Sequence, residues 1–200
     1  MDRNDVELEK EVPLHDGFFR MVRLHLRHRL FAGGWSPTMT REVVRHGTVA
    51  AIIPYDPVRD TVILIEQFRA AIFAAGDPQP WSISIAAGMI EPGESAEEMA
   101  RRETLEETGC TVGRLEKASE FYSSPGGSSQ HVTLFCGEIS TEGAGGLYGV
   151  ADESEDIKAF VKTADEAIAM ADSGAIDNAV SILGLQWLAR NRDSLRARWT

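Results

Sequence analysis

Three glutamates lie close together in the sequence: Glu106 and Glu107 follow Glu103 by three and four residues. Residues three or four apart share one face of a helix, so a helix here would hold these carboxylates side by side. They would repel each other, and near the helix C-terminus the helix dipole also disfavours negative charge. Hard cations such as Mg²⁺ bind oxygen ligands and would offset both penalties. The cluster indicates either a divalent-cation site or a solvated acidic helix face.

The elements that would position these carboxylates are a helix and the strand before it. We predict a helix over residues 95–108, because Ser95 and Glu98 have the spacing of a capping box and Gly109 is a typical helix end. Residues 81–87 are predicted to form a short strand that ends at Gly88. Further strands are expected near residues 49–54, 61–68, 115–122, 132–139 and 157–161, and C-terminal helices near 164–172 and 177–196. This mixture indicates an α/β layered domain.

The N-terminal segment has a different pattern. Residues 1–16 are polar and of mixed charge, and we expect a loose arm there. Alternating apolar residues from Phe18 onward and again near Met39 to Val44 predict a β-hairpin with a turn at residues 32–35. A lone hairpin is marginally stable in water, so it must pack on the main domain or on another subunit. We therefore expect a β arm over residues 1–46 and the main domain over residues 47–200.

Composition restricts the function classes. The 200 residues include 31 acidic and 20 basic side chains, for a net charge of −11, which argues against a general nucleic-acid-binding protein. Cys110 and Cys136 cannot form a disulfide framework, and we expect both to be core residues in a reducing compartment. The polar N-terminus and the lack of a long apolar run predict no signal peptide and no membrane partner, so a cytoplasmic location is expected.

The spacing around the glutamates is more specific than the cluster itself. Residues 88–109 read GMIEPGESAEEMARRETLEETG, and every charged and glycine position fits Gx5Ex7REUxEExGU, where U is aliphatic. This pattern resembles the Nudix box. Two aliphatic positions depart from it, since they hold Thr104 and Cys110. Both side chains are still able to pack on an apolar surface.

The resemblance extends over nearly the whole chain, from about Asn4 to Trp199, and is to the bacterial ADP-ribose pyrophosphatase subgroup. The segments that carry it are residues 41–44, 56–60, 65–69, 124–127, 151–157 and 176–179, with Pro125 at the proline position that marks the subgroup. The resemblance implies an α/β/α sandwich with a mixed sheet. It also implies a homodimer whose N-terminal strands exchange between subunits.

The resemblance also implies roles for individual residues. Mg²⁺, with Mn²⁺ as an alternative, would be bound by Glu103, Glu107, Glu155 and the carbonyl of Ala87. Glu153 would be the general base and Glu106 would act beside the metal, while Glu94 and Arg102 would form a positioning pair. The substrate-binding candidates are Phe18, Phe19, Arg41, Glu42, Arg69, Met89, Ser124, Pro125 and Gly126. The implied reaction cuts the pyrophosphate of ADP-ribose to give AMP and ribose 5-phosphate.

Three positions depart from the subgroup pattern. Ser84 and Gln130 stand where the pattern has Glu, and His46 stands where it has Arg. These departures favour an alternative, a Nudix hydrolase of another nucleoside diphosphate derivative such as a sugar nucleotide. Two other classes agree less well with the residues. A non-hydrolysing ADP-ribose sensor would have an eroded box, and an acidic ion-buffering protein would not explain the box spacing.

Overall fold

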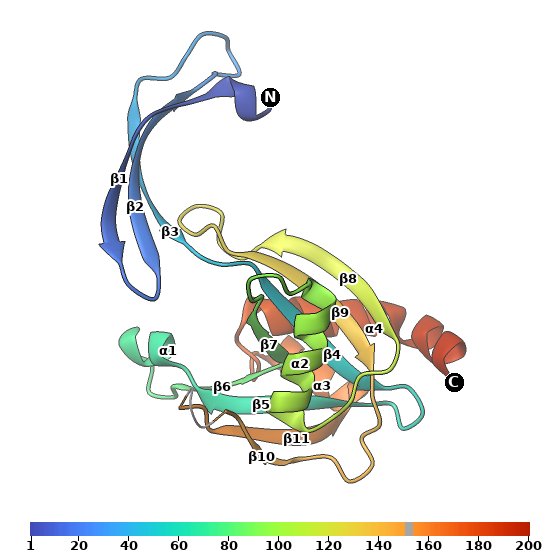
Figure 1. The fold of residues 1–200 in the computed structure, drawn as a ribbon. Coiled ribbons are helices and arrows are strands. Elements are labelled where there is room, and N and C mark those ends of the chain that lie inside the picture. The colour runs from blue at the N-terminus through green and yellow to red at the C-terminus, as the bar shows by residue number, and fades with distance from the viewer. Residues whose placement is uncertain (151–153) are drawn as a thin grey trace. The chain divides into compact units, whose positions relative to one another are not determined.

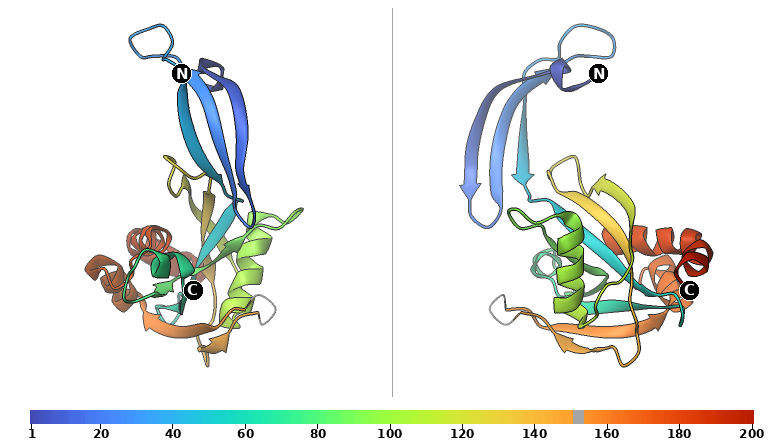
Figure 2. Two further views of the ribbon diagram at one scale, coloured as in Figure 1. Left: turned by 90° about the vertical axis from the view of Figure 1, so that its left-hand side faces the viewer. Right: turned by 45° about the vertical axis from the view of Figure 1, so that its right-hand side comes forward.

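The computed structural model describes residues 1–150 and 154–200, which form two compact units: residues 1–47 with 122–131, and residues 48–121 with 132–200. In the first unit, a short 3₁₀ turn (Arg3–Asp5) precedes a three-stranded antiparallel sheet in the order β1–β2–β3 (Figure 2). Its strands are β1 (Val6–Asp16), β2 (Arg20–His28) and β3 (Met39–Arg45). The predicted hairpin is therefore confirmed as β2 and β3.

The expectation of a loose arm over residues 1–16 was wrong, because most of this segment is strand β1. Its register with β2 places Leu8 opposite Leu26. Cross-strand ion pairs support the pairing, with Arg27 2.6 Å from Glu7. Opposite charges on neighbouring strands stabilise a sheet modestly and give no apolar alternation, so the hydrophobic pattern misses such a strand.

The second unit is built on a mixed eight-stranded sheet. Its main path runs β10–β11–β5–β4–β9–β8, while β6 pairs with β5 and β7 pairs with β4. β4 is parallel to β9, whereas β5 is antiparallel to both β4 and β11. The strands are β4 (Val49–Asp56), β5 (Thr61–Phe68), β6 (Trp81–Ser84), β7 (Ala86–Met89), β8 (Leu115–Tyr122), β9 (His131–Glu138), β10 (Gly146–Tyr148) and β11 (Ile157–Thr163).

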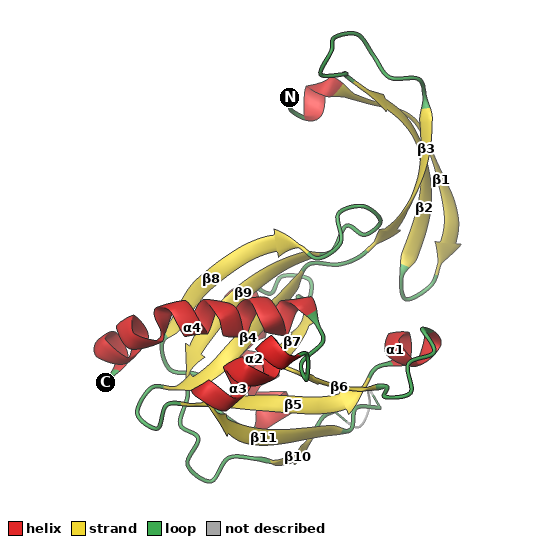
Figure 3. Cartoon of the chain, turned by 180° about the vertical axis from the view of Figure 1, so that it is seen from behind, coloured by secondary structure: helices red, strands yellow, loops and turns green. Residues whose placement is uncertain are grey.

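Helices cover both faces of this sheet. α2 (Ala96–Thr108) lies across one face, and α3 (Ala164–Ser173) and α4 (Ala179–Trp199) lie on the other (Figures 1, 2 and 3). β5 shows why two cores form: Ile63 and Ile65 pack with α2, while Leu64, between them, packs with α4. A strand buried on both faces has a continuous apolar run, as β4 has over residues 49–55 and β5 over residues 62–65. This arrangement confirms the predicted α/β/α sandwich.

Three elements differ from the expectations. The predicted strand over residues 81–87 is two short strands, β6 and β7, which pair with different neighbours, and β10 lies between the strands expected near residues 132–139 and 157–161. A five-residue helix, α1 (Ala70–Ala74), was not predicted, since so short a segment has too few turns to show a helical period. Cys110 and Cys136 are buried and unpaired as expected. Within the described ranges, no helix combines the length and apolar character needed to cross a membrane.

The predicted ends of α2 are confirmed. The Ser95 hydroxyl accepts from the Glu98 backbone N–H at 3.2 Å, and the Glu98 carboxylate accepts from the Ser95 N–H at 2.8 Å. Gly109 ends α2 with a φ of 71°, a left-handed conformation that glycine adopts without strain. The helix therefore starts and stops where its own residues dictate.

A buried carboxylate fixes the β4–β5 turn and gives a test of the fold. Asp56 is 1% exposed and accepts from the backbone N–H groups of Val58 and Arg59 at 3.0 Å and of Thr141 at 2.8 Å. Burial raises its pKa, but these hydrogen bonds outweigh burial and hold the pKa below the ordinary value of 3.8.

A carboxyl with a lowered native pKa stabilises the fold above its ordinary pKa, and that contribution is lost as the pH falls. We expect Asp56→Ala to lower the free energy of unfolding at pH 7 by about 2–4 kcal/mol, because it leaves several buried donors unpaired. The difference should shrink toward pH 3 in urea titrations. Glu142→Ala, which removes an exposed carboxylate paired with Arg59, is the matched control and should cost under about 1 kcal/mol. Equal losses for the two variants would contradict the role of Asp56.

Candidate active site

The strand before α2 and the helix itself approach each other at Gly88. A Cβ atom built on Gly88 would lie 1.9 Å from Oε1 of Glu103. No side chain fits there, so the glycine lets the Glu103 carboxylate lie against the backbone of β7. The first glycine of the box is thus explained by close approach rather than by an unusual backbone conformation.

Glu107 lies one helical turn further along and is the most buried carboxylate of the cluster. It is 1% exposed, and its Oε2 accepts from the Ala87 backbone N–H at 3.2 Å. Burial raises the pKa of Glu107 well above its ordinary value, and repulsion from Glu103 adds to the rise. Burial also raises the pKa of Glu103, although Arg102 opposes the shift. The positive charge near these two carboxylates does not offset their desolvation, so further positive charge would stabilise their ionised forms.

Arg102 organises the carboxylates around it. Its guanidinium lies 2.9 Å from Glu94, 2.9 Å from Glu103 and 3.0 Å from Glu106. It also donates to the carbonyl of Met89 at 3.4 Å. The predicted Glu94–Arg102 pair is therefore confirmed. Charge-assisted bonds of this kind fix both the loop before α2 and the side-chain directions on the helix.

Arg69 is a half-buried cation on the same side of the sheet. It directly follows β5. Burial lowers the pKa of its guanidinium, while the carboxylates of Glu107 and Glu155 oppose this shift. Among residues 1–150 and 154–200, no group accepts a hydrogen bond from its guanidinium. Free donors beside buried carboxylates suit an anion that arrives with its own cations, as a metal-bound phosphate does.

The donor set fits a hard divalent cation. In the described part of the chain, no three His, Cys, Asp or Glu side chains already surround a common point. Arg102 holds Glu103 in this arrangement. The chemistry nevertheless matches, because the carboxylates of Glu103 and Glu107 beside the backbone of β7 offer the oxygen atoms that a hard divalent cation binds. Ala87 touches Glu107 through its N–H, and a ligand role for its carbonyl stays a prediction. Glu153 lies outside the described residues.

The first unit gathers another set of predicted residues. Phe18 and Phe19 lie in the turn between β1 and β2, not at a strand start, with ring centroids 4.8 Å apart. Phe18 is 84% exposed, so this aromatic pair is not core. The ring of His46 lies 4.8 Å from that of Phe19, and Nε2 of Gln130 lies 3.3 Å from Nε2 of His46. The unit thus presents exposed aromatic faces next to neutral polar groups.

The predicted substrate-binding turn at Ser124, Pro125 and Gly126 is tied to β3. Val44 donates to the carbonyl of Gly127 at 2.9 Å, which holds the turn against the strand. On β3, neighbouring residues point to opposite faces, so Arg41 and Glu42 lie on opposite sides of the strand.

Arg41 and Glu42 also have separate partners. Glu42 pairs with Arg23 at 2.7 Å, and Arg41 donates to the Thr40 carbonyl at 2.8 Å. The two predicted residues are therefore not an ion pair with each other. Their substrate contacts stay a prediction, as do those of Met89.

Two site features were not found from the sequence. The ring of Tyr148 packs on the end of α2, since a Cβ on Gly109 would lie 2.7 Å from Tyr148 Cε1. Tyr148 is the last residue of β10 and precedes the segment that carries Glu155. Its position as an aromatic residue among glycines is the sequence signal that could have indicated this packing. The Oγ of Ser84 is buried and has no hydrogen-bond partner among the described residues.

Comparison with known proteins shows the family to which this chain belongs. Residues 44–179 match the NUDIX domain family, and the chain belongs to that family. It is 42% identical to the ADP-ribose pyrophosphatase of Escherichia coli (strain K12), over 98% of this chain and 94% of that protein. The corresponding Haemophilus influenzae protein is 41% identical, over 98% and 92%. A GDP-mannose pyrophosphatase of Enterobacter sp. is 32% identical, over 92% and 94%.

A solved structure shares the fold. The crystal structure of an ADP compounds hydrolase superposes with a TM-score of 0.73, covering 97% of this chain and 96% of that one. Its sequence identity is 18%, so the likeness concerns the fold alone.

Gly88 offers a direct test of the site geometry. In Gly88→Ala the new Cβ would displace the flexible end of Glu103 rather than the backbone. We expect the free energy of unfolding to change by less than about 1 kcal/mol, while Mn²⁺ affinity falls about 10- to 100-fold. Calorimetric Mn²⁺ titration and urea unfolding measure the two. Gly127→Ala, with nothing within 4 Å of the new Cβ, is the control. Unchanged Mn²⁺ affinity in Gly88→Ala would mean that Glu103 is not a ligand.

Proposed function

We propose that this protein is a divalent-metal-dependent pyrophosphatase that hydrolyses ADP-ribose to AMP and ribose 5-phosphate. The observation that carries the proposal is the pairing of buried Glu107 with largely buried Glu103, beside the Arg69 guanidinium, which has no hydrogen-bond partner among the described residues. The similarity to ADP-ribose pyrophosphatases along nearly the whole chain supports the substrate. We infer that Mg²⁺ is the working ion, with Mn²⁺ as an alternative.

The chain's own residues divide the work. Glu103, Glu107, Glu155 and the Ala87 carbonyl would hold the metal, which neutralises phosphate charge and activates water when bound. Arg69 would bind a phosphate oxygen, and Arg102 positions Glu103. Glu153 would take the proton of the attacking water, as a carboxylate does in general base catalysis.

Glu106 would act beside the metal ligands. Its carboxylate lies 3.0 Å from Arg102, so it stabilises the guanidinium that also holds Glu103. A release of this contact would free Glu106 to accept a proton or to bind metal-bound water. We therefore assign Glu106 a supporting role in catalysis.

We propose that the first unit completes the substrate site within a homodimer. Exposed apolar side chains on β1, namely Val6, Leu8 and Leu14, are 46%, 56% and 38% exposed, and a second subunit would bury them. Phe18 and Phe19 would stack on the adenine, with Arg41, Glu42, Met89 and the turn at Ser124, Pro125 and Gly126 as further contacts. The arm over residues 1–46 would be the exchanged part.

We further infer a cytoplasmic enzyme that takes a small nucleotide and binds neither nucleic acid nor membrane. The net charge of −11 supports this, because phosphate backbones and anionic lipids attract basic surfaces. Two buried, unpaired cysteines suit a reducing compartment.

A second substrate class has specific support. Charged groups of the subgroup pattern are replaced in this chain by Ser84, His46 and Gln130. In addition, the 32% identical relative is a GDP-mannose pyrophosphatase. Turnover of ADP-ribose and GDP-mannose, each with Mg²⁺ and with chelator, separates the two. We expect chelator-sensitive release of AMP and a kcat/KM at least about tenfold higher for ADP-ribose, equivalent to about 1.4 kcal/mol. A preference for GDP-mannose would keep the metal site and reject the substrate.

Two glutamate variants separate metal binding from proton transfer. Glu107→Gln keeps an acceptor for the Ala87 N–H but removes a buried ligand charge, so both Mn²⁺ affinity and turnover should fall, turnover by about 100-fold or more. Glu153→Gln should lower kcat by about 10²- to 10⁴-fold and leave Mn²⁺ affinity within about twofold. Calorimetry and steady-state kinetics measure the two properties. Parallel loss of both properties in both variants would contradict the division of roles.

A further inference from the structure

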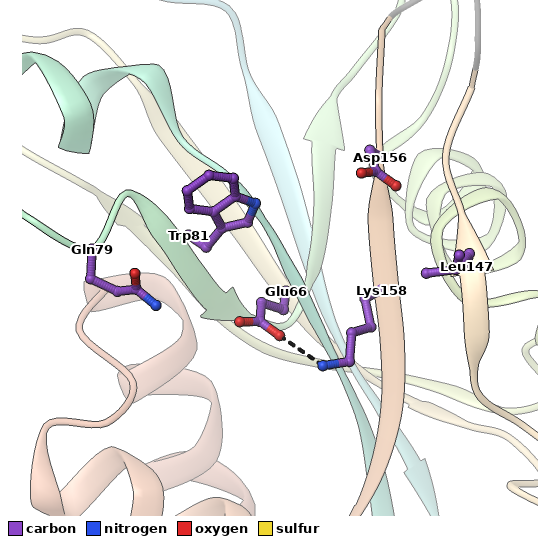
Figure 4. Close-up of a pocket in the computed structure, with 6 residues that line it drawn as sticks. All are labelled: Glu66, Gln79, Trp81, Leu147, Asp156 and Lys158. Carbon is purple, nitrogen blue, oxygen red and sulfur yellow. Dashed lines mark hydrogen bonds and ion pairs between the residues drawn. The ribbon is translucent and has the colours of Figure 1, made fainter.

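A hollow lies on the sheet of the second unit, away from the glutamate cluster. It has a volume of about 320 Å³ and is lined by Glu66, Gln79, Trp81, Leu147, Asp156 and Lys158 (Figure 4). This volume lies at the lower end of the range of small-molecule sites. None of the six residues belongs to the box or to the substrate-binding set proposed above.

Strand alternation places this hollow on the opposite face of the sheet from α2. Ile65 and Ile157 pack in the core beneath α2, so their neighbours Glu66 and Lys158 point the other way. Glu155 interacts electrostatically with Glu107 on the α2 side. Asp156, the next residue, lines the hollow instead. The sheet therefore separates the hollow from the catalytic carboxylates.

The hollow combines an aromatic wall with hydrogen-bond donors and acceptors. Nζ of Lys158 lies 3.2 Å from the Glu66 carboxylate in its middle, with Gln79 and Trp81 on one side and Asp156 and Leu147 on the other (Figure 4). Trp81 is 51% exposed, and the Phe68 ring packs on it edge-on at 5.6 Å. The indole is thus held in place while much of its surface faces solvent.

This composition excludes most ligand classes. Two carboxylates would repel a phosphate, and Lys158 would repel a cation. A purely apolar ligand would desolvate charged groups without pairing them. A hydroxyl group both donates and accepts, so a hydroxyl-rich ring could use the carboxylates as acceptors and the ammonium and amide as donors. The C–H face of such a ring would pack on the indole.

We propose that this hollow binds an uncharged monosaccharide ring, a pentose or a hexose. Trp81 is the stacking surface, Asp156 and Glu66 accept hydroxyl hydrogen bonds, and Lys158 and Gln79 donate to hydroxyl oxygens. The proposal does not depend on the substrate of the glutamate site, because the two lie on opposite faces of the sheet.

The test measures binding to the whole protein without metal, in chelator, so that the nucleotide reaction does not contribute. Ligand-observed NMR follows titrations with D-ribose, D-mannose and D-ribose 5-phosphate. We expect saturable binding of at least one free sugar and weaker binding of the phosphorylated one. Trp81→Ala and Asp156→Asn should each weaken that sugar at least about tenfold, the loss expected for one good contact to an aromatic or charged group.

Asp193→Asn is the matched control, since it neutralises an exposed carboxylate on α4 and should leave sugar binding unchanged. Thermal unfolding would reveal whether Trp81→Ala fails to fold. Asp156→Asn is an isosteric change of an exposed side chain, so it still tests the proposal in that case. Absence of saturable binding by both free sugars would overturn the proposal. So would sugar binding that survives both variants, or ribose 5-phosphate that binds through Trp81 as tightly as ribose.

Discussion

The site depends on one costly feature, the burial of Glu103 and Glu107 next to each other against the backbone of β7. Desolvation raises the pKa of both, and repulsion from Glu103 raises that of Glu107 further. The fold offsets the penalty locally, through Arg102 on Glu103 and the Ala87 N–H on Glu107. The part of the penalty that the fold does not offset would favour binding of a cation, so stability lost here would be recovered as metal-binding energy.

The sheet supplies the geometry that this arrangement needs. β6 pairs with β5 and β7 pairs with β4, so the chain moves from one strand to its neighbour at Ile85. That move places Gly88 on the face covered by α2 and brings the backbone N–H of Ala87 within reach of Glu107. The absence of a side chain at Gly88 then allows the close approach of Glu103. A continuous strand, as the sequence predicts, would have kept its pairing with β5 alone.

The sequence predicted best what local chemistry decides. Ser95, Glu98 and Gly109 bound α2 through their own hydrogen bonds and backbone preference, so its limits were readable. β1 was missed because cross-strand ion pairs rather than apolar alternation accompany its pairing with β2, and α1 because it is too short to show a period. In the site, the box spacing indicated the carboxylates. The packing of Tyr148 on Gly109 depends on tertiary approach, which no local pattern contains.

The departures from the subgroup pattern are not independent of one another. His46 and Gln130 lie far apart in sequence, yet their side chains meet at 3.3 Å within the first unit. Where the pattern has an Arg and a Glu, this chain has an imidazole and an amide in contact, so the two departures lie at one point of the structure. A paired change of this kind preserves the local fold while it alters the groups offered to a ligand. Ser84 differs, because its buried hydroxyl lacks a partner among the described residues and replaces a carboxylate singly. Any shift in substrate recognition is therefore more readily traced to the His46–Gln130 contact, and any change in the tuning of the buried glutamates to Ser84.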